Sequence, residues 1–232
     1  MAVINKRVYS EKKEITMEDN DNKALAEDFE KKASDAFDSM MDLFNRLTKE
    51  SLSLVGNQAS TDSDKIVGSM AILFSGILQE CLIEIGIADG DFDLNERLFV
   101  EKIGNRYPIS LLSAFVDSDG KAELTWDGFF AMSPHERANF LDQVKKTGTP
   151  LALQLYSFFA SVDLTVSDEH PYLSELKGYL VDFINAYLSI DLERTELENT
   201  RAVDVLKDNI LNPLEEAYDE AGIEAHRIDG KA

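Results

Sequence analysis

The amino-acid sequence predicts an all-α protein, built as a bundle of about seven to nine helices. Over most of the chain, apolar residues recur at intervals of three and four, which is the spacing of one face of an α-helix. Residues that favour helix starts and helix ends lie between these stretches. Only VDSDGKAELTW offers a hairpin-like pattern, and it could equally form a loop. At 232 residues, 44% of them apolar, the chain is long enough to bury a core.

The N-terminal part predicts a flexible tail followed by one long helix. Residues 1–20 are polar, charged and aperiodic, which is typical of an unstructured segment. From about residue 22 to about residue 55, one apolar face recurs with helical spacing, and its members are Phe29, Ala33, Phe37, Met40, Phe44 and Leu47. Such a face is too apolar to remain in water. We expect it to pack on its own chain, or else to bind a partner, including a second copy of the chain in a homodimer.

The remaining helices are expected in order along the chain. An apolar helix spans the stretch from Ile66 to Ile85. Further helical patterns lie in ISLLSAFV, SPHERANFLDQVKKTG, PLALQLYSFFASV, PYLSELKGYLVDFINAYLSI and ENTRAVDVLKDNILNPLEEAYDEAG. Pro213 lacks a backbone N–H, so it should kink or restart the final helix. We expect a single helical domain over residues 21–222 and a flexible C-terminal tail over residues 223–232.

Residues typical of helix ends support these assignments. Ser133 and Glu136 have the spacing of a capping box, with Pro134 at the first helical position, where its missing N–H costs nothing. Gly148 is expected to end that helix and Gly222 to end the last one, because glycine adopts the left-handed conformation that follows many helices.

The charge balance excludes several classes of partner. Lys and Arg number 23 against 44 Asp and Glu, a net charge of −21, which repels nucleic acids and anionic membrane surfaces. We therefore expect no direct nucleic-acid binding. The single cysteine, Cys81, can form no intrachain disulfide and fits a reducing compartment. No apolar stretch reaches the roughly 18 residues that a membrane span needs, and the N-terminus lacks the apolar part of a signal peptide. These features predict a cytoplasmic protein.

Acidic residues gather in IADGDFDLNERLFVEKI, residues 87–103, between two expected helices. Asp89, Asp91 and Asp93 have the spacing of an EF-hand loop, but the glycine and the final glutamate of such a loop are absent. One interpretation is a capping box, in which Asp93 accepts a backbone hydrogen bond and Glu96 reaches back. The other is a site for a divalent cation.

A second copy of this pattern lies in SVDLTVSDEHPYLSEL, residues 161–176. When Asp163 is aligned on Asp89, both copies follow an apolar helix, end it with an Asp and open the next helix with a capping residue. Two such helix–turn–helix units indicate an internal duplication.

The two motifs resemble those of the tellurite-resistance B (TerB-like) family, whose domains are acidic helical bundles with paired motifs of the form A-D-G-x-hydrophobic-[S/D]-x-x-E. The first copy matches through Ala88, Asp89, Gly90, Phe92, Asp93 and Glu96, and the second, more weakly, through Asp163, Val166, Ser167, Asp168 and Glu169. In the second copy, Leu164 replaces the glycine and His170 replaces the final glutamate. The resemblance covers about residues 63–190, so helices before and after this core would be additions to it.

The resemblance implies a cytoplasmic module that acts in stress, metal-response or phage-defence settings through its acidic surface on metal ions or partner proteins. Carried over residue by residue, it places candidate metal ligands at Asp89, Asp93, Glu96, Asp163 and Glu169. Carboxylates crowded at two helix starts are ligands for Ca²⁺ or Mg²⁺, and the positive helix N-termini would help to hold their charge. The alternative is that these residues only cap helices and keep the domain soluble. No other cofactor is expected.

No enzymatic activity is expected from the motifs. The three histidines do not stand in H-E-x-x-H spacing, and the chain contains no G-x-S-x-G, Walker or G-x-G-x-x-G motif. A competing function is the inhibition of a DNA-binding protein by rows of carboxylates that imitate a nucleic-acid backbone. The acidic helices also carry Lys or Arg, so we expect the acids to be scattered rather than aligned in one ridge.

Overall fold

Helices dominate the described part of the chain. The computed structural model describes residues 17–54, 63–88, 94–106, 126–167, 169–190, 192 and 194–229. Its elements are α1 (Met17–Leu54), α2 (Ser63–Gly86), α3 (Leu94–Arg106), α4 (Trp126–Ala131), α5 (Pro134–Val166), α6 (Pro171–Tyr187), α7 (Glu196–Leu206), a π-helical segment (Lys207–Leu211) and α8 (Asn212–Asp229). Over these ranges there is no strand, and the predicted all-α class is confirmed.

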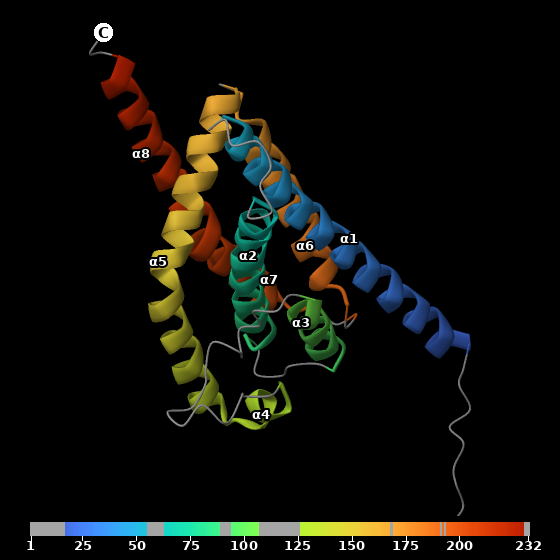
Figure 1. Cartoon of the computed structure of the whole chain (residues 1–232). Helices are drawn as coiled ribbons and strands as arrows, with labels where there is room; N and C mark the ends of the chain where they lie inside the picture. The colour runs from blue at the N-terminus through green and yellow to red at the C-terminus, as the bar shows by residue number, and fades with distance from the viewer. Residues whose placement is uncertain are drawn as a thin grey trace, which may run out of the picture.

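Two pairs of helices flank a central helix. Figure 1 shows α2 in the middle of the bundle, with α5 and α8 crossing on one side and α1 and α6 running along each other on the other side. Helices α3 and α7 also pack on α2. The sequence of α2 is apolar over most of its circumference, as expected for a helix that is contacted from several directions. Helix α2 is therefore the central helix, and helices from both sides of the bundle pack against it.

The apolar face of α1 lies in the core of this bundle. Phe37, Met40 and Leu47 are fully buried. The ring of Phe44 stacks on the ring of Phe74 of α2, with centroids 4.3 Å apart. Burying one such large side chain stabilises the fold by roughly 1.5–3 kcal/mol. The expectation that this helix packs on its own chain is confirmed.

Helix α5 begins where the sequence predicts but does not end at Gly148. Ser133 accepts a hydrogen bond from the backbone N–H of Glu136, whose carboxylate accepts one from the backbone N–H of Ser133. The helix then continues through Gly148 and Pro150 to Val166, so the predicted end at Gly148 is wrong. Glycine lowers helix stability by only about 1 kcal/mol, which the apolar burial on both sides of Gly148 outweighs.

Pro213 restarts the last helix, as predicted. Helix α7 passes into the π-helical segment, and α8 begins one residue before Pro213. Because α8 continues to Asp229, the predicted end at Gly222 is wrong, and the expected tail over residues 223–232 begins inside this helix. The turns of α8 before Gly222 pack on the core through Leu214 and other apolar residues, which holds the helix beyond a locally unfavourable glycine.

Several predictions fall on residues outside the described ranges. They concern ISLLSAFV, the hairpin-or-loop stretch VDSDGKAELTW except for its last residue, and residues 1–16 of the expected N-terminal tail. Residues 17–20 of that tail belong to α1. Of the helices in the described ranges, none combines the length and the apolar character that crossing a bilayer requires.

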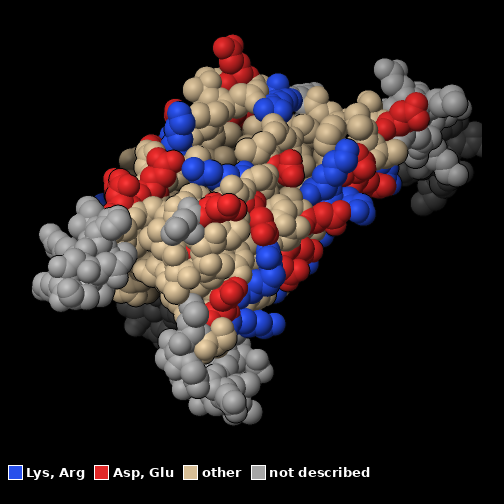
Figure 2. Space-filling model, turned by 90° about the horizontal axis from the view of Figure 1, so that it is seen from above, with Lys and Arg blue, Asp and Glu red and all other residues tan. Residues whose placement is uncertain are grey.

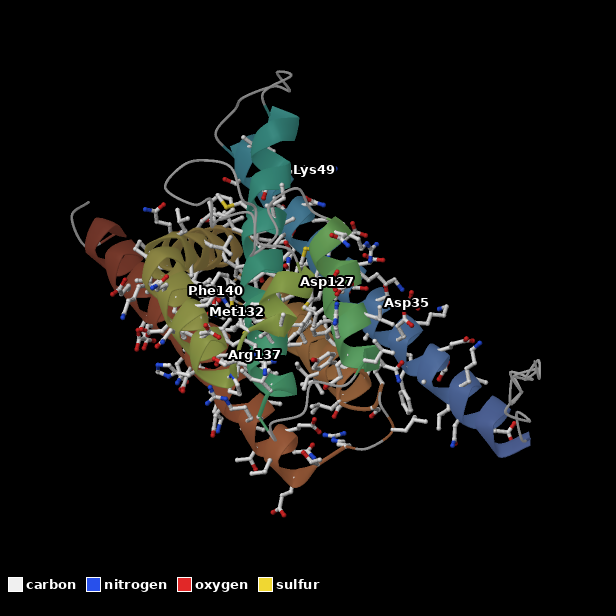
Figure 3. All side chains as sticks on the ribbon, turned by 90° about the horizontal axis from the view of Figure 1, so that it is seen from below. Asp35, Lys49, Asp127, Met132, Arg137 and Phe140 are labelled. Carbon is white, nitrogen blue, oxygen red and sulfur yellow. The ribbon has the colours of Figure 1, made fainter. Side chains whose placement is uncertain are left out.

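Acidic and basic side chains are interspersed on one face of the molecule (Figure 2). On the face shown in Figure 2, Lys and Arg lie among Asp and Glu. Along α1, Lys31 pairs with Asp35 at 2.5 Å and Lys32 pairs with Asp28 at 2.6 Å. Figure 3 labels Asp35 on α1 and Asp127 on α4, so these two acids belong to different helices. On the face in Figure 2 the acids are scattered, as the sequence predicts, and do not form one ridge.

Candidate functional site

In the second acidic turn, hydrogen bonds to Asp163 connect three helices. This residue is fully buried in the last turn of α5. Its Oδ1 accepts a hydrogen bond from the backbone N–H of Tyr172 (3.1 Å) and its Oδ2 accepts one from that of Leu173 (3.0 Å), both in the first turn of α6. The hydroxyl of Tyr218 on α8 donates to the same carboxylate. Asp163 therefore acts as a helix cap that a neighbouring helix supplies.

The residues after Asp163 have different environments. Glu169 is exposed. His170 directly precedes α6 and lies in the left-handed region with φ 49°, and its side chain makes no capping hydrogen bond. Its ring packs edge-on against Tyr218, with centroids 5.3 Å apart. The structure thus leaves the two candidate ligands of this turn in contrasting places, with Asp163 buried under α6 and Glu169 at the surface.

The first acidic turn is described only in part. Asp89 and Asp93 lie outside the described residues, as does Asp168 of the second turn. Glu96 is buried in the first turn of α3. Across the described ranges, no cluster of three or more His, Cys, Asp or Glu side chains could hold a metal ion. Binding of Ca²⁺ or Mg²⁺ by the five candidate ligands therefore stays a prediction.

A pocket of about 240 Å³ lies between α2, α5 and the π-helical segment. Its aliphatic walls are formed by Ile72, Leu73 and Ile77 of α2 and by Val144, Ala152 and Leu153 of α5. The pocket opens to solvent beside Leu151 and Leu153, whose side chains are both 47% exposed. Two helices thus present a cavity with apolar walls at the surface of the bundle.

Two glycines keep this pocket open. Gly76 of α2 and Gly148 of α5 both line it, and a Cβ atom added to either would meet no heavy atom within 4 Å. The space for a side chain is therefore present at both positions. Glycine inside a helix destabilises it by roughly 0.5–1 kcal/mol relative to alanine. The chain has this loss of helix stability at two positions, Gly76 and Gly148. At both positions the missing side chain leaves empty volume in the pocket.

Glu84 pairs with two basic groups, Lys145 of the pocket and Arg201 of α7. This carboxylate of α2 is buried, and the guanidinium of Arg201 on α7 donates to its Oε2 at 2.9 Å. Lys145 of α5 pairs with its Oε1. A buried carboxylate is stable only when it is paired in this way. Lys145 lines the pocket and shares the carboxylate of Glu84 with Arg201.

Glu80 lines the pocket one helical turn before Glu84. Burial raises the pKa of Glu80 to about 7, the nearby carboxylate of Glu84 raises it as well, and Lys145 opposes the shift. The Glu80 carboxyl group therefore gains or loses its proton near neutral pH.

Two hydroxyl groups of the pocket donate to backbone carbonyls. The Tyr156 hydroxyl donates to the carbonyl of Asn209 at 2.7 Å, and the Thr149 hydroxyl donates to that of Lys145 at 2.6 Å. Asn209 lies four residues before Pro213, which has no N–H to donate to that carbonyl. Tyr156 replaces the missing donor and so supports the π-helical segment at the end of the pocket. Such segments frequently occur at functional sites.

No motif in the sequence marks this pocket, because its residues come from three separate segments. The sequence features that relate to the pocket are single residues that are unusual within their own helices. Gly76 and Glu80 interrupt an otherwise apolar helix, and Pro213 interrupts the final one. Gly148, the fourth signal, is also typical of a helix end and was interpreted in that way.

The chain matches no protein-family model, no curated protein and no solved structure. The resemblance to TerB-like domains therefore stays a prediction, and the function has to be inferred from the geometry of the chain itself.

Proposed function

We propose that the protein is a non-enzymatic binding module that takes a small apolar molecule into the pocket between α2, α5 and the π-helical segment. The observation that carries this proposal is an apolar volume of about 240 Å³ that two helix-interior glycines leave open. Ligand sites are typically concave and mostly apolar, with a few polar groups that fix the orientation of the ligand. Glu80, Asp208 and Asn209 are polar groups of this kind.

The volume limits the size of the ligand. An engineered cavity of about 150 Å³ takes up benzene. Pockets for drug-sized ligands measure roughly 300–1,000 Å³, and the pocket here, at about 240 Å³, is smaller. A molecule of about ten non-hydrogen atoms, such as an eight-carbon chain with a small head group, matches this volume by proportion.

Binding without catalysis is supported by the state of the pocket's reactive groups. The hydroxyls of Thr149 and Tyr156 both donate to backbone carbonyls. Burial raises the pKa of Tyr156, and also that of the neighbouring Cys81 thiol, well above its ordinary value. A nucleophile needs a lowered pKa or an adjacent base. These groups are instead kept in their protonated, weakly nucleophilic forms.

The pocket has better geometric support than the acidic surfaces on which the TerB-like resemblance places function. In the second acidic turn, three donors already occupy the carboxylate of Asp163. Imitation of nucleic acid needs rows of carboxylates, whereas acidic and basic groups alternate on the face in Figure 2. The pocket, in contrast, leaves room for a ligand between apolar walls.

The test uses octan-1-ol as an uncharged probe, with binding measured by isothermal titration calorimetry. Gly148→Leu should place a side chain in the pocket and weaken binding by about tenfold or more, since it fills the space of the ligand. Gly178→Leu is the matched control, because Gly178 is an exposed helical glycine of α6 that also has open space around its Cβ position. It should bind octan-1-ol as the native chain does.

Two results would contradict the proposal. If the native chain does not bind octan-1-ol, the pocket is not a site for small apolar molecules. If Gly148→Leu binds as tightly as the native chain, the probe binds elsewhere. Both leucine variants are expected to fold, because each replaces a helical glycine where nothing stands in the way of a side chain.

A further inference from the structure

We propose that the ligand of this pocket is a cationic amphiphile, a primary alkyl- or arylalkylammonium ion whose charged head lies between Glu80 and Asp208. This inference rests on the proposed function and adds the chemical class of the ligand. The apolar walls accept the body of such a molecule, and the charge of the polar lining residues selects its head group.

The charged lining residues are two acids and one base. Glu80 comes from α2, Asp208 from the π-helical segment and Lys145 from α5. Lys145 pairs with Glu84, which also holds Arg201. Among the described residues, no basic side chain pairs with Glu80 or Asp208. Counted together, Glu80, Asp208 and Glu84 against Lys145 and Arg201 leave a net charge of −1 when Glu80 is ionised.

An anionic ligand would meet unfavourable interactions in the same place. Its head group would approach Glu80 and Asp208, and it could gain Lys145 only by drawing that residue from Glu84. Glu84 would keep Arg201 but lose one of its two ion pairs, which costs free energy at a buried carboxylate. A neutral hydroxyl head group would avoid this repulsion and could donate to a carboxylate, but it would add no ion pair. An ammonium head is favoured over both.

Binding of an ammonium ion should change the protonation of the pocket. A positive charge beside Glu80 favours the carboxylate form, so Glu80 should release its proton when the ligand binds near pH 7. The titratable groups that interact with Glu80 are Glu84 and Cys81 on the same helix and Lys145 and Tyr156 on α5, and Asp208 of the π-helical segment lines the same pocket. Glu84 and Lys145 are paired with each other.

The test compares octylamine, octan-1-ol and octanoate, three probes with an eight-carbon chain and different head groups. Octylamine should bind the native chain about tenfold more tightly than octan-1-ol, the size of effect that one added charge pair gives in a partly buried site. Octanoate should bind more weakly than octan-1-ol. Calorimetry near pH 7 in buffers of different ionisation enthalpy should show proton release with octylamine and none with octan-1-ol.

Glu80→Gln is the decisive variant. It should lose the preference for octylamine over octan-1-ol and the proton release, while octan-1-ol still binds. Glu216→Gln, at an exposed position of α8 outside the pocket, is the control and should keep both. If octan-1-ol binds and octylamine binds no more tightly, the cationic ligand class is wrong and the proposed function stands. If octan-1-ol does not bind, the proposed function fails and this inference fails with it.

Discussion

The carboxylate of Asp163 gathers donors from two different helices at one buried point. It accepts the backbone N–H groups of Tyr172 and Leu173 and the hydroxyl of Tyr218. Burial and the carboxylate together raise the pKa of Tyr218 far above its ordinary value, so this hydroxyl stays a donor. A metal ion bound to Asp163 would have to displace these donors. The geometry favours capping over metal ligation for this residue.

Asp163→Asn should therefore destabilise the fold with or without metal. An asparagine side chain offers a single acceptor oxygen, so at least one buried donor loses its partner. We expect a loss of about 2–3 kcal/mol in the free energy of unfolding, measured by urea denaturation. Glu169→Gln, at the exposed candidate ligand, is the control and should change the stability by less than about 0.5 kcal/mol. A loss for Asp163→Asn that appears only in millimolar Ca²⁺ or Mg²⁺ would instead support the metal site.

Glu80 gives the native chain a specific pH dependence. Its folded-state pKa of about 7 lies above its ordinary value of 4.5. Between these two pH values the unfolded chain has lost the proton and the folded chain still holds it, so the stability falls as the pH rises. Glu80→Gln removes this titration. The variant should be more stable than the native chain at pH 8, by at most about 3 kcal/mol, and the two should converge below pH 4.5. Thermal melting across this range measures the difference, and a native stability that rises between these pH values relative to Glu80→Gln would contradict it.

At the scale of elements, the π-helical segment depends on a hydrogen bond from another helix. Pro213 cannot donate to the carbonyl of Asn209, and the Tyr156 hydroxyl does so. Tyr156→Phe should leave this part-buried carbonyl without that donor and cost about 1–2 kcal/mol in unfolding free energy. In a Pro213→Ala background, the restored N–H can donate to Asn209, so the same substitution should cost less. A double-mutant cycle from denaturation curves measures this coupling. Equal costs in both backgrounds would show that the hydroxyl and the proline act independently.

Helix boundaries could be predicted where a neighbouring side chain fixes them. The capping box formed by Ser133 and Glu136 lies within four consecutive residues, and the structure contains it as predicted. The cap of α6 could not be predicted in the same way, because Asp163 belongs to the preceding helix. Gly148 shows a further limit. A glycine only lowers helix stability, and whether the helix ends there depends on how much apolar surface the following turns bury.

The pocket could not be predicted from the sequence, whereas most of the helices could. Gly76 and Gly148 become neighbours of one cavity only when α2 and α5 pack together. In the sequence each is an isolated helix breaker, and Glu80 is one of two acids, four residues apart, in the C-terminal half of a mostly apolar helix. Long-range packing turns these local anomalies into one site. Residues that weaken their own helix without an evident local reason are therefore useful markers when a structure is examined for binding sites.

At the scale of the whole molecule, the net charge of −21 would act on a charged ligand at long range, whereas the pocket would act on it only at short range. An excess of carboxylates attracts cations and repels anions before any contact forms. Ion pairs such as Lys102 with Glu30, at 2.6 Å, join different helices without cancelling this excess. The overall field would therefore favour the approach of an ammonium ion, while Glu80 and Asp208 would select it after entry.

The integrity of the whole bundle should depend on the buried face of α1. Phe37 is fully buried and contacts Phe183 of α6, with ring centroids 6.2 Å apart. Phe37→Asp would place an unpaired carboxylate in the core and remove an aromatic ring, for a combined loss of about 4 kcal/mol or more. Because a domain of this size is stable by only about 5–15 kcal/mol, we expect a much lower melting temperature by circular dichroism.

A matched substitution on the same helix separates self-packing from dimerisation. Leu25 lies on the exposed part of α1, so Leu25→Asp should leave the melting temperature unchanged. Size-exclusion chromatography of both variants shows whether either one changes the size of the native species. If Phe37→Asp melts normally and elutes as a smaller species, the face of α1 forms an interface between copies in solution. Since Phe37 is buried against a helix of its own chain, we expect unfolding instead.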